Sequence, residues 1–494
     1  MDAQPAAFTC AVNFLACVAS GMRWKLAYYN NGMRRVSVLL AALVLSLAFT
    51  LVSAGPEADA RLKKASRAAE RNGWIEVHLE GSPAEIGFQH GYLLAPEIED
   101  TFKDISTEMA HDEKKDWAFF RAVARDVFWP RIETEYRDEL TGIAAGLKAR
   151  NVNLDIWDVV ALNAWLELPY YDKALSTENT PAVTADHCSA FVATGSYTKD
   201  GRVVIGHNSW TSYSSGERWN IIFDIAPARG RRLVMDGMPG LIHSGDDFGI
   251  NAAGIAVTET TISAFKGFDP QGVPEFVRAR KAMQYSASID DFARIMKDGN
   301  NGGYANTWLV ADRKTNEIAS LELGLKNVTL ERTRDGYFVG SNFPSNPKLV
   351  KEETDFDTAD RSRSENARHE RWLALMAEYK GRIDVAAGEK FLADHGDAFD
   401  GSTQPSERTL CGHVDLSPRG MGAWQSAYAP SGAVQNKVTD AAGIRKMSLM
   451  AAMGHACGLS FKASEYFPKH PQFDWYEPIL HDMPARQWTR FPAK

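Results

Sequence analysis

The sequence predicts an α+β fold in which antiparallel sheets are covered by helices. Blocks of short strand-like segments, each bounded by Gly, Pro or Asp, are flanked by blocks with helical spacing of apolar residues. The strand-like segments are joined by hairpin turns such as Lys199-Asp200-Gly201, where a parallel sheet would need helical crossovers. Because the chain contains no internal repeat or low-complexity tract, we expect one large domain.

The expected elements begin with a mainly helical part. A strand at 74–79 alternates with period two, and Ser82 then caps a helix. Helical spacing continues over 100–150 and 154–166, and a polar loop at 172–186 leads into the strand-rich part. Strands are expected there at 188–194, 202–205, 219–226, 231–236, 241–243, 248–259, 305–312, 316–323, 327–332 and 336–341. Helices are expected at 274–285, 288–298 and 362–379, near 386–396 and near 438–453.

The N-terminal residues predict export. From Met33 the chain reads Met-Arg-Arg, followed by an apolar run that ends Val52-Ser53-Ala54. A positive start, an apolar centre and small residues at the exit are typical of a secretory signal peptide at 33–54, cleaved after Ala54. An uncleaved membrane anchor is the alternative, since the run approaches spanning length. We expect translation to start at Met33, which makes 1–32 a non-native extension and the mature protein secreted or periplasmic.

The net charge limits the kinds of binding partner, and the cysteine count indicates an unpaired thiol. The formal net charge of −8 argues against nucleic acid, because phosphate binding needs a basic face. Cys10 and Cys17 precede the expected mature start, which leaves Cys188, Cys411 and Cys457. An odd number of cysteines in an exported protein leaves one thiol unpaired. Cys411 and Cys457 form a disulfide in one interpretation and two buried free thiols in the other.

Cys188 is the candidate nucleophile. The polar loop ends at Asp186-His187 and runs directly into Cys188, the first residue of a hairpin strand. Cleavage between His187 and Cys188 would leave a free α-amine that can act as the base for the adjacent thiol. The alternative is a small buried cysteine that begins a core strand. The return strand brings Gly206-His207-Asn208-Ser209-Trp210 alongside the cysteine, although the residues alone do not fix the register.

Several segments together resemble the phospholipase B-like proteins. They are Cys188-Ser189-Ala190, Gly206-His207-Asn208-Ser209-Trp210, Val257-Thr258-Glu259-Thr260-Thr261 and Tyr304-Ala305-Asn306-Thr307-Trp308. That family is grouped with the N-terminal-nucleophile (Ntn) hydrolases and is similar to the penicillin V acylases and the acyl-CoA:6-aminopenicillanate acyltransferases. The early segment Gly81-Ser82-Pro83-Ala84-Glu85-Ile86-Gly87 resembles the start of the acyltransferase precursors. The resemblance extends over most of the mature chain.

The resemblance implies a fold and a maturation step. The fold is the four-layer αββα sandwich of Ntn hydrolases, with two antiparallel sheets and helices on both outer faces. Autocatalytic cleavage before Cys188 would divide the mature chain into an N-terminal helical fragment (55–187) and a catalytic region (188–494). The cleaved fragment would remain as a partner of the catalytic region.

The resemblance also implies roles for particular residues. His207 and Asn208 occupy the place of the group that contacts the new amine, where related acylases carry an acidic residue. Asn306 matches an oxyanion-hole donor, the kind of group that contributes strongly to acyl transfer. A later arginine is expected in the site, and Arg368 is our choice, with Arg371 as its competitor one helical turn away.

The predicted function is an exported, self-processing cysteine hydrolase that cleaves linear amide (N-acyl) bonds through a thioester acyl-enzyme. Thr260 and Trp210 are expected to contact the small-molecule acyl amide or lipid substrate, with core packing as the alternative for Trp210. An acyl-ester hydrolase or acyltransferase on the same site, and a non-catalytic binding protein, are the other functions considered. No cofactor and no metal are expected, because Cys411-Gly412-His413 alone is a weak metal motif.

Overall fold

The computed structural model describes residues 59–175, 188–245, 248–422 and 425–492. The expected extension at 1–32, the signal peptide at 33–54 and His187 lie outside these residues. The fold described below is that of the unit Arg61–Lys494. Within the described ranges, no helix is both long enough and apolar enough to cross a bilayer.

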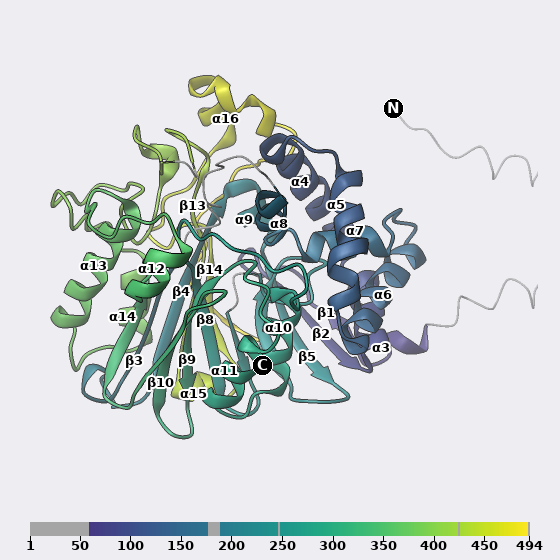
Figure 1. Cartoon of the computed structure of the whole chain (residues 1–494), viewed down its shortest axis with the longest axis horizontal. Helices are drawn as coiled ribbons and strands as arrows, with labels where there is room; N and C mark the ends of the chain where they lie inside the picture. The colour runs from purple at the N-terminus through teal and green to yellow at the C-terminus, as the bar shows by residue number, and fades with distance from the viewer. Residues whose placement is uncertain (1–58, 176–187, 246–247, 423–424, 493–494) are drawn as a thin grey trace, which may run out of the picture. The chain divides into compact units, whose positions relative to one another are not determined.

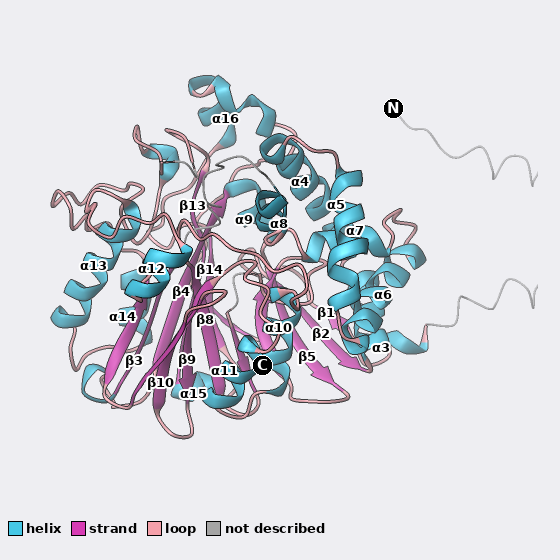
Figure 2. Ribbon diagram, viewed as in Figure 1, coloured by secondary structure: helices cyan, strands magenta, loops and turns pink. Residues whose placement is uncertain are grey.

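The described strands form two sheets, drawn in magenta in Figure 2. The sheet of nine has, in order, β1 (Ser66–Arg67), β2 (Ile75–Gly81), β5 (Ile221–Pro227), β6 (Leu233–Gly237), β7 (Gly249–Asn251), β8 (Ile255–Thr261), β9 (Asn306–Asp312), β10 (Glu317–Leu323) and β11 (Val328–Thr333). The sheet of six has, in order, β12 (Gly336–Gly340), β3 (Ser189–Thr194), β4 (Val204–Ser212), β13 (Ser431–Asp440), β14 (Leu449–Met453) and β15 (Thr489–Phe491).

Strand pairing is antiparallel in both sheets with one exception. Strands β2 and β5 pair in parallel, from Ile75 opposite Ile221 to Gly81 opposite Pro227. A parallel pair needs a long connection, and the helices that follow β2 provide one. The N-terminal part, expected to be mainly helical, therefore also contributes β1 and β2 to the larger sheet.

Helices cover the sheets, as Figure 1 shows. In the described residues they are α3 (Pro83–Leu93), α4 (Ala95–Glu113), α5 (Trp117–Val123), α6 (Thr134–Ala149), α7 (Ile156–Asn163), α8 (Leu168–Leu175), α9 (Tyr213–Arg218), α10 (Glu275–Tyr285), α11 (Ile289–Lys297), α12 (Pro347–Glu353), α13 (Ser364–Glu378), α14 (Val385–Leu392), α15 (Ala441–Arg445) and α16 (Ala463–Tyr466). Helix α3 begins as expected, with Ser82 and Glu85 forming a reciprocal capping box.

Apolar clusters lie between these layers. One cluster joins the two sheets and includes Ala190, Ile205 and Leu309. A second packs α13 and α14 against β3, β4 and β13, and a third packs the N-terminal helices with α10 and α11 against the larger sheet. The predicted α+β class, with two mostly antiparallel sheets and covering helices, is confirmed.

The expected helix near 438–453 is wrong. That segment forms the end of β13, the short helix α15 and the strand β14. Strand β13 is buried at every position except Asp440, because it lies between β4 and β14 in the middle of its sheet. A strand covered on both faces lacks the alternation of polar and apolar residues by which strands are recognised in sequence.

Two smaller expectations differ as well. The segment at 248–259 is not one strand but the hairpin of β7 and β8, which turns at 252–254. The segment at 241–243, expected as a strand, is irregular, with bends at 242–243. A short apolar run cannot by itself separate a strand from a buried loop.

Candidate active site

The hairpin of β3 and β4 places the candidate nucleophile. Ser189 pairs with Asn208 and Ala190 with His207, which fixes the register that the sequence left open. Every residue of both strands is buried. On the far side of β3, Ala190 pairs with Gly340 of β12. Cys188 therefore lies just before a strand that is enclosed on both edges.

The main-chain atoms of Cys188 are held by two side chains. The backbone N–H of Cys188 donates to Asn342 Oδ1 at 2.9 Å, and the carbonyl oxygen of Cys188 accepts from Arg368 Nη1 at 2.6 Å. Arg368 Nη2 also donates to Asn342 Oδ1 at 3.0 Å. Cys188, Asn342 and Arg368 thus form a closed polar ring, and all three are buried.

Asn342 was not among the predicted site residues. It follows β12 with a φ of 65°, a left-handed conformation that Asn tolerates better than most residues. Its Nδ2 donates to the carbonyl oxygen of Thr261 at 2.9 Å, which orients Oδ1 toward Cys188. An Asn at the end of a predicted strand is the only signal in the sequence, and it is a weak one.

The structure brings Arg368, and not Arg371, to Cys188. Arg368 Nε donates to Ser364 Oγ at 2.9 Å, and its guanidinium lies 4.5 Å from the centre of the Trp210 ring. Burial lowers the pKa of Arg368 to about 10, against the opposing effect of Glu365, so the side chain stays cationic at neutral pH. Arg371 instead makes a bidentate ion pair with Asp394.

Two ionisable side chains approach the Cys188 thiol. Cys188, His207 and Glu259 each offer one sulfur, nitrogen or oxygen atom, and these atoms lie within 4.8 Å of one another. Tyr304 donates its hydroxyl proton to Glu259 Oε1 at 3.4 Å. Glu259 was not predicted, although it is the sole charged residue of β8. The thiol therefore lies beside groups that can exchange protons with it.

Asn306 begins β9 close to the polar ring. It pairs with Thr261, whose carbonyl oxygen accepts from Asn342. The Asn306 side chain is fully buried, and its amide forms no hydrogen bond within the described residues. A fixed and unengaged donor is the feature that an oxyanion hole requires. Its role stays a prediction, because no acyl group is present to define it.

Thr260 lies near the start of β3, beside Gly340 of β12. It pairs with Thr307 of β9, and a Cβ added to Gly340 would come within 2.6 Å of its side chain. Since Gly340 is opposite Ala190, Thr260 lies close to the start of β3. Thr260 is buried, and its contact with substrate stays a prediction.

Asn208 and Trp210 lie on the face of β4 that Arg368 also approaches, since its guanidinium is 4.5 Å from the centre of the Trp210 ring. Asn208 Nδ2 donates to the carbonyl oxygens of Leu392 and Leu410, and Trp210 Nε1 also donates to Leu410. His207, the residue before Asn208 on the strand, projects from the opposite face. In the uncleaved chain the backbone N–H of Cys188 donates to Asn342, and the expected contact of Asn208 with the new α-amine stays a prediction.

The three cysteines that the structure describes are all free thiols. Of the two interpretations left open for Cys411 and Cys457, the structure has the free thiols, and each sulfur approaches His413 Nε2, at 3.6 Å and 3.4 Å. Among the described residues, two groups of side chains could hold a metal ion: Cys188 with His207 and Glu259, and His413 with His395 and the two remaining cysteines.

The family model described as phospholipase B matches residues 84–351, which is more than half of the 494 residues. An uncharacterized protein of Archaeoglobus fulgidus is 25% identical over 354 residues, covering 65% of this chain and 58% of that protein. Human phospholipase B-like 1 is 25% identical over 310 residues, covering 53% of this chain and 56% of the human protein. The chain thus matches less than two thirds of the length of these relatives. By the extent of the family match, the chain belongs to the phospholipase B family.

Proposed function

We propose that this chain is a self-processing cysteine acyl hydrolase of the Ntn class, with Cys188 as its N-terminal nucleophile. The observation that carries the proposal is that both main-chain polar groups of Cys188 are hydrogen-bonded to side chains. Its N–H donates to Asn342, and its carbonyl oxygen accepts from Arg368. A residue that acts through its side chain alone does not need both backbone atoms fixed. A residue whose own nitrogen becomes the general base does.

The proposed maturation starts from the intact chain. The Cys188 thiol attacks the carbonyl carbon of the preceding residue, and the acyl group moves from nitrogen to sulfur. This shift breaks the peptide bond and frees the α-amine of Cys188, which takes up the thiol proton. Water then hydrolyses the thioester, which releases the thiol of Cys188 and the carboxylate of the preceding residue. The Cys188 side chain is fully buried before cleavage, so exposure of the thiol to an external substrate is part of the proposal.

The proposed turnover uses the same thiol. The α-amine takes the thiol proton, and the thiolate attacks the acyl carbonyl carbon of the substrate. The resulting oxyanion accepts hydrogen bonds from the Asn306 amide and from backbone N–H groups. The bond to the leaving group then breaks, and that group takes the proton held by the amine. Water finally hydrolyses the thioester and restores Cys188.

Two kinds of scissile bond fit this chemistry. The sequence predicts a linear amide, and this stays our first candidate for the substrate. Membership of the phospholipase B family supports an acyl ester as the second, because that is the bond its name denotes. The two sheets with helices outside them support the four-layer Ntn arrangement. Export through a signal peptide at 33–54 remains part of the proposal.

The decisive experiment follows the fate of the 187–188 bond in the purified full-length chain. N-terminal sequencing should find two fragments, one of which begins Cys-Ser-Ala-Phe. Cys188→Ala should stay in one piece and be inactive, while Cys188→Ser, which keeps a nucleophile of similar size, should be cleaved more slowly. Circular dichroism should show that both variants are folded.

Two results would overturn the proposal. One is an intact chain that turns over substrate, and the other is cleavage of Cys188→Ala at the same bond, which would show that a separate protease acts. The substrate class is then decided by the ratio of kcat/KM for N-acyl amino compounds to kcat/KM for phospholipids.

A further inference from the structure

A cluster of four metal-binding side chains lies apart from Cys188. His395, Cys411, His413 and Cys457 each offer one nitrogen or sulfur atom, and these four atoms lie within 4.8 Å of one another. They come from three segments: the loop after α14, the loop before Val414–Leu416, and the turn after β14. In the sequence only the Cys411-Gly412-His413 segment indicates such a site, because the other two residues are distant along the chain.

The distances in this cluster match those of a tetrahedral zinc site. With Zn–S bonds of about 2.3 Å and Zn–N bonds of about 2.0 Å, sulfur and nitrogen ligands lie about 3.5 Å apart. The Sγ atoms of Cys411 and Cys457 lie 3.6 Å and 3.4 Å from His413 Nε2. Two cysteines and two histidines are also a ligand set that zinc commonly takes in structural sites.

His413 has the surroundings of a metal-bound histidine. Its Nε2 faces both sulfurs, while its Nδ1 lies 3.9 Å from Asp415 Oδ1. A carboxylate beside the second ring nitrogen is the usual partner of a zinc-bound histidine. Asp415 is itself held by the Tyr213 hydroxyl, which donates to Oδ1 at 2.5 Å.

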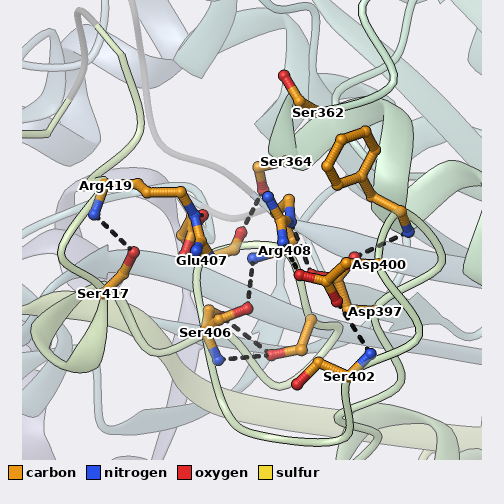
Figure 3. Close-up of polar contacts among 12 residues, drawn as sticks. Ser362, Ser364, Asp397, Asp400, Ser402, Ser406, Glu407, Arg408, Ser417 and Arg419 are labelled. Atoms are coloured by element: carbon orange, nitrogen blue, oxygen red, sulfur yellow. Dashed lines mark hydrogen bonds and ion pairs between the residues drawn. The ribbon is translucent and has the colours of Figure 1, made fainter.

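The segments that carry the ligands are fixed by bonds that do not involve the cluster. The backbone N–H of Cys411 donates to the carbonyl oxygen of Asp394, the residue before His395, at 3.0 Å. Figure 3 shows the loop between them, where the buried Arg408 pairs with Asp397 and Asp400. These contacts hold the segments of His395 and Cys411 near one another before any ion binds, which lowers the entropic cost of binding.

We propose that His395, Cys411, His413 and Cys457 bind one Zn²⁺ ion in a closed, structural site. Binding replaces the two thiol protons, which are released to solvent, and no electron is transferred. The site would fasten Leu410, whose carbonyl oxygen accepts from Asn208 and Trp210 of β4. It would therefore stabilise β4, the strand that carries His207, through contacts on the outer face of that strand. This proposal does not depend on the reaction at Cys188.

The test is the zinc content of the purified full-length protein, measured by mass spectrometry of the digested sample. We expect about one zinc per chain in the wild type. Cys411→Ser and Cys457→Ser should each lower bound zinc at least tenfold. Cys188→Ser is the matched control, because Cys188 belongs to the other possible metal group, and it should keep its zinc.

A second measurement covers the case in which the variants fail to fold. Wild-type protein stripped with a chelator and reloaded with Co²⁺ should show the thiolate charge-transfer and ligand-field absorption of a tetrahedral site. Three outcomes would overturn the proposal: a Cys411–Cys457 disulfide in the peptide map of the unreduced protein, no zinc after refolding with Zn²⁺, or zinc that is lost in Cys188→Ser and kept in Cys457→Ser.

Discussion

Lys437 Nζ lies 2.8 Å from Asp236 Oδ2, and this ion pair joins the two sheets with both side chains fully buried. Lys437 belongs to β13 of the smaller sheet, where it pairs with His207, and Asp236 belongs to β6 of the larger one. Asp236 Oδ1 also accepts from Ser244 Oγ at 3.0 Å. The buried ion pair therefore connects the two sheets at Lys437, the residue that pairs with His207, and His207 lies near Cys188.

Removing one partner of this pair should be costly. Lys437→Met leaves a buried carboxylate without its cation, so we expect the free energy of unfolding to fall by about 3–5 kcal/mol. The double variant Asp236→Asn with Lys437→Met buries no charge and should recover much of that loss. Urea unfolding of the three proteins measures both effects. A double variant as unstable as Lys437→Met would contradict this account.

Asn342 can be tested without disturbing its backbone. Asn342→Gly keeps the left-handed φ of 65° at no steric cost and removes the amide that meets Cys188 and Arg368. We expect cleavage before Cys188 and turnover to slow by about tenfold or more, as for the loss of a hydrogen bond to a charged group. Asn342→Asp keeps the acceptor and should retain more of the processing rate. Equal rates in Asn342→Gly and wild type would exclude a positioning role.

Arg368 and a surface arginine can be compared directly. Arg368→Lys loses the planar fork that reaches both Cys188 and Asn342, and we expect kcat to fall by about tenfold to a hundredfold. Arg361→Lys changes an exposed bidentate pair with Glu370 and should leave kcat unchanged. Steady-state kinetics on both variants, with thermal melting as a folding check, measures the difference.

The hairpin at Cys188 could be predicted because its signals are local. A polar loop, a cysteine at a strand start and the Asp200-Gly201 turn are adjacent in the sequence, and the structure has β3 and β4 there. Asn342 could not be found in this way. Its contact with Cys188 depends on β12 pairing with β3, and no local pattern specifies a pairing between strands so far apart.

The same limit explains what the sequence left open about the site. Asn208 is in the predicted strand, but whether its side chain faces Cys188 or Leu410 depends on a one-residue choice of register. Glu259 lies in a strand that was expected, yet its proximity to Cys188 arises from the packing of two sheets. The resemblance to a known family supplied the non-local information behind the choice of Arg368, which contacts Cys188, whereas Arg371 pairs with Asp394; the role of Arg368 in the reaction stays a prediction.

Asn306 should separate activity from stability. If its amide serves the oxyanion, Asn306→Ala should lower kcat by about a hundredfold to a thousandfold. The free energy of unfolding should change by less than about 1 kcal/mol, because the cavity is offset by removal of a buried amide that forms no bond within the described residues. Asn163→Ala is the control. Asn163 is equally buried but makes three hydrogen bonds, so its loss should cost about 2 kcal/mol or more and leave kcat unchanged.

His90 should make the fold sensitive to acid. Its Nε2 accepts from the backbone N–H of Gly240 at 2.9 Å, and burial, aided by Arg280, lowers its pKa to about 3. In the unfolded chain the pKa returns to near 6.5, so unfolding takes up a proton at any pH between these values. The free energy of unfolding should therefore fall as the pH drops below about 6.5, with His90 contributing up to about 1.4 kcal/mol per pH unit. His90→Gln keeps an acceptor for Gly240 but cannot titrate, so its unfolding free energy should fall less steeply from pH 6.5 to pH 4. Parallel pH profiles for the two proteins, from urea unfolding, would show that the acid sensitivity arises elsewhere.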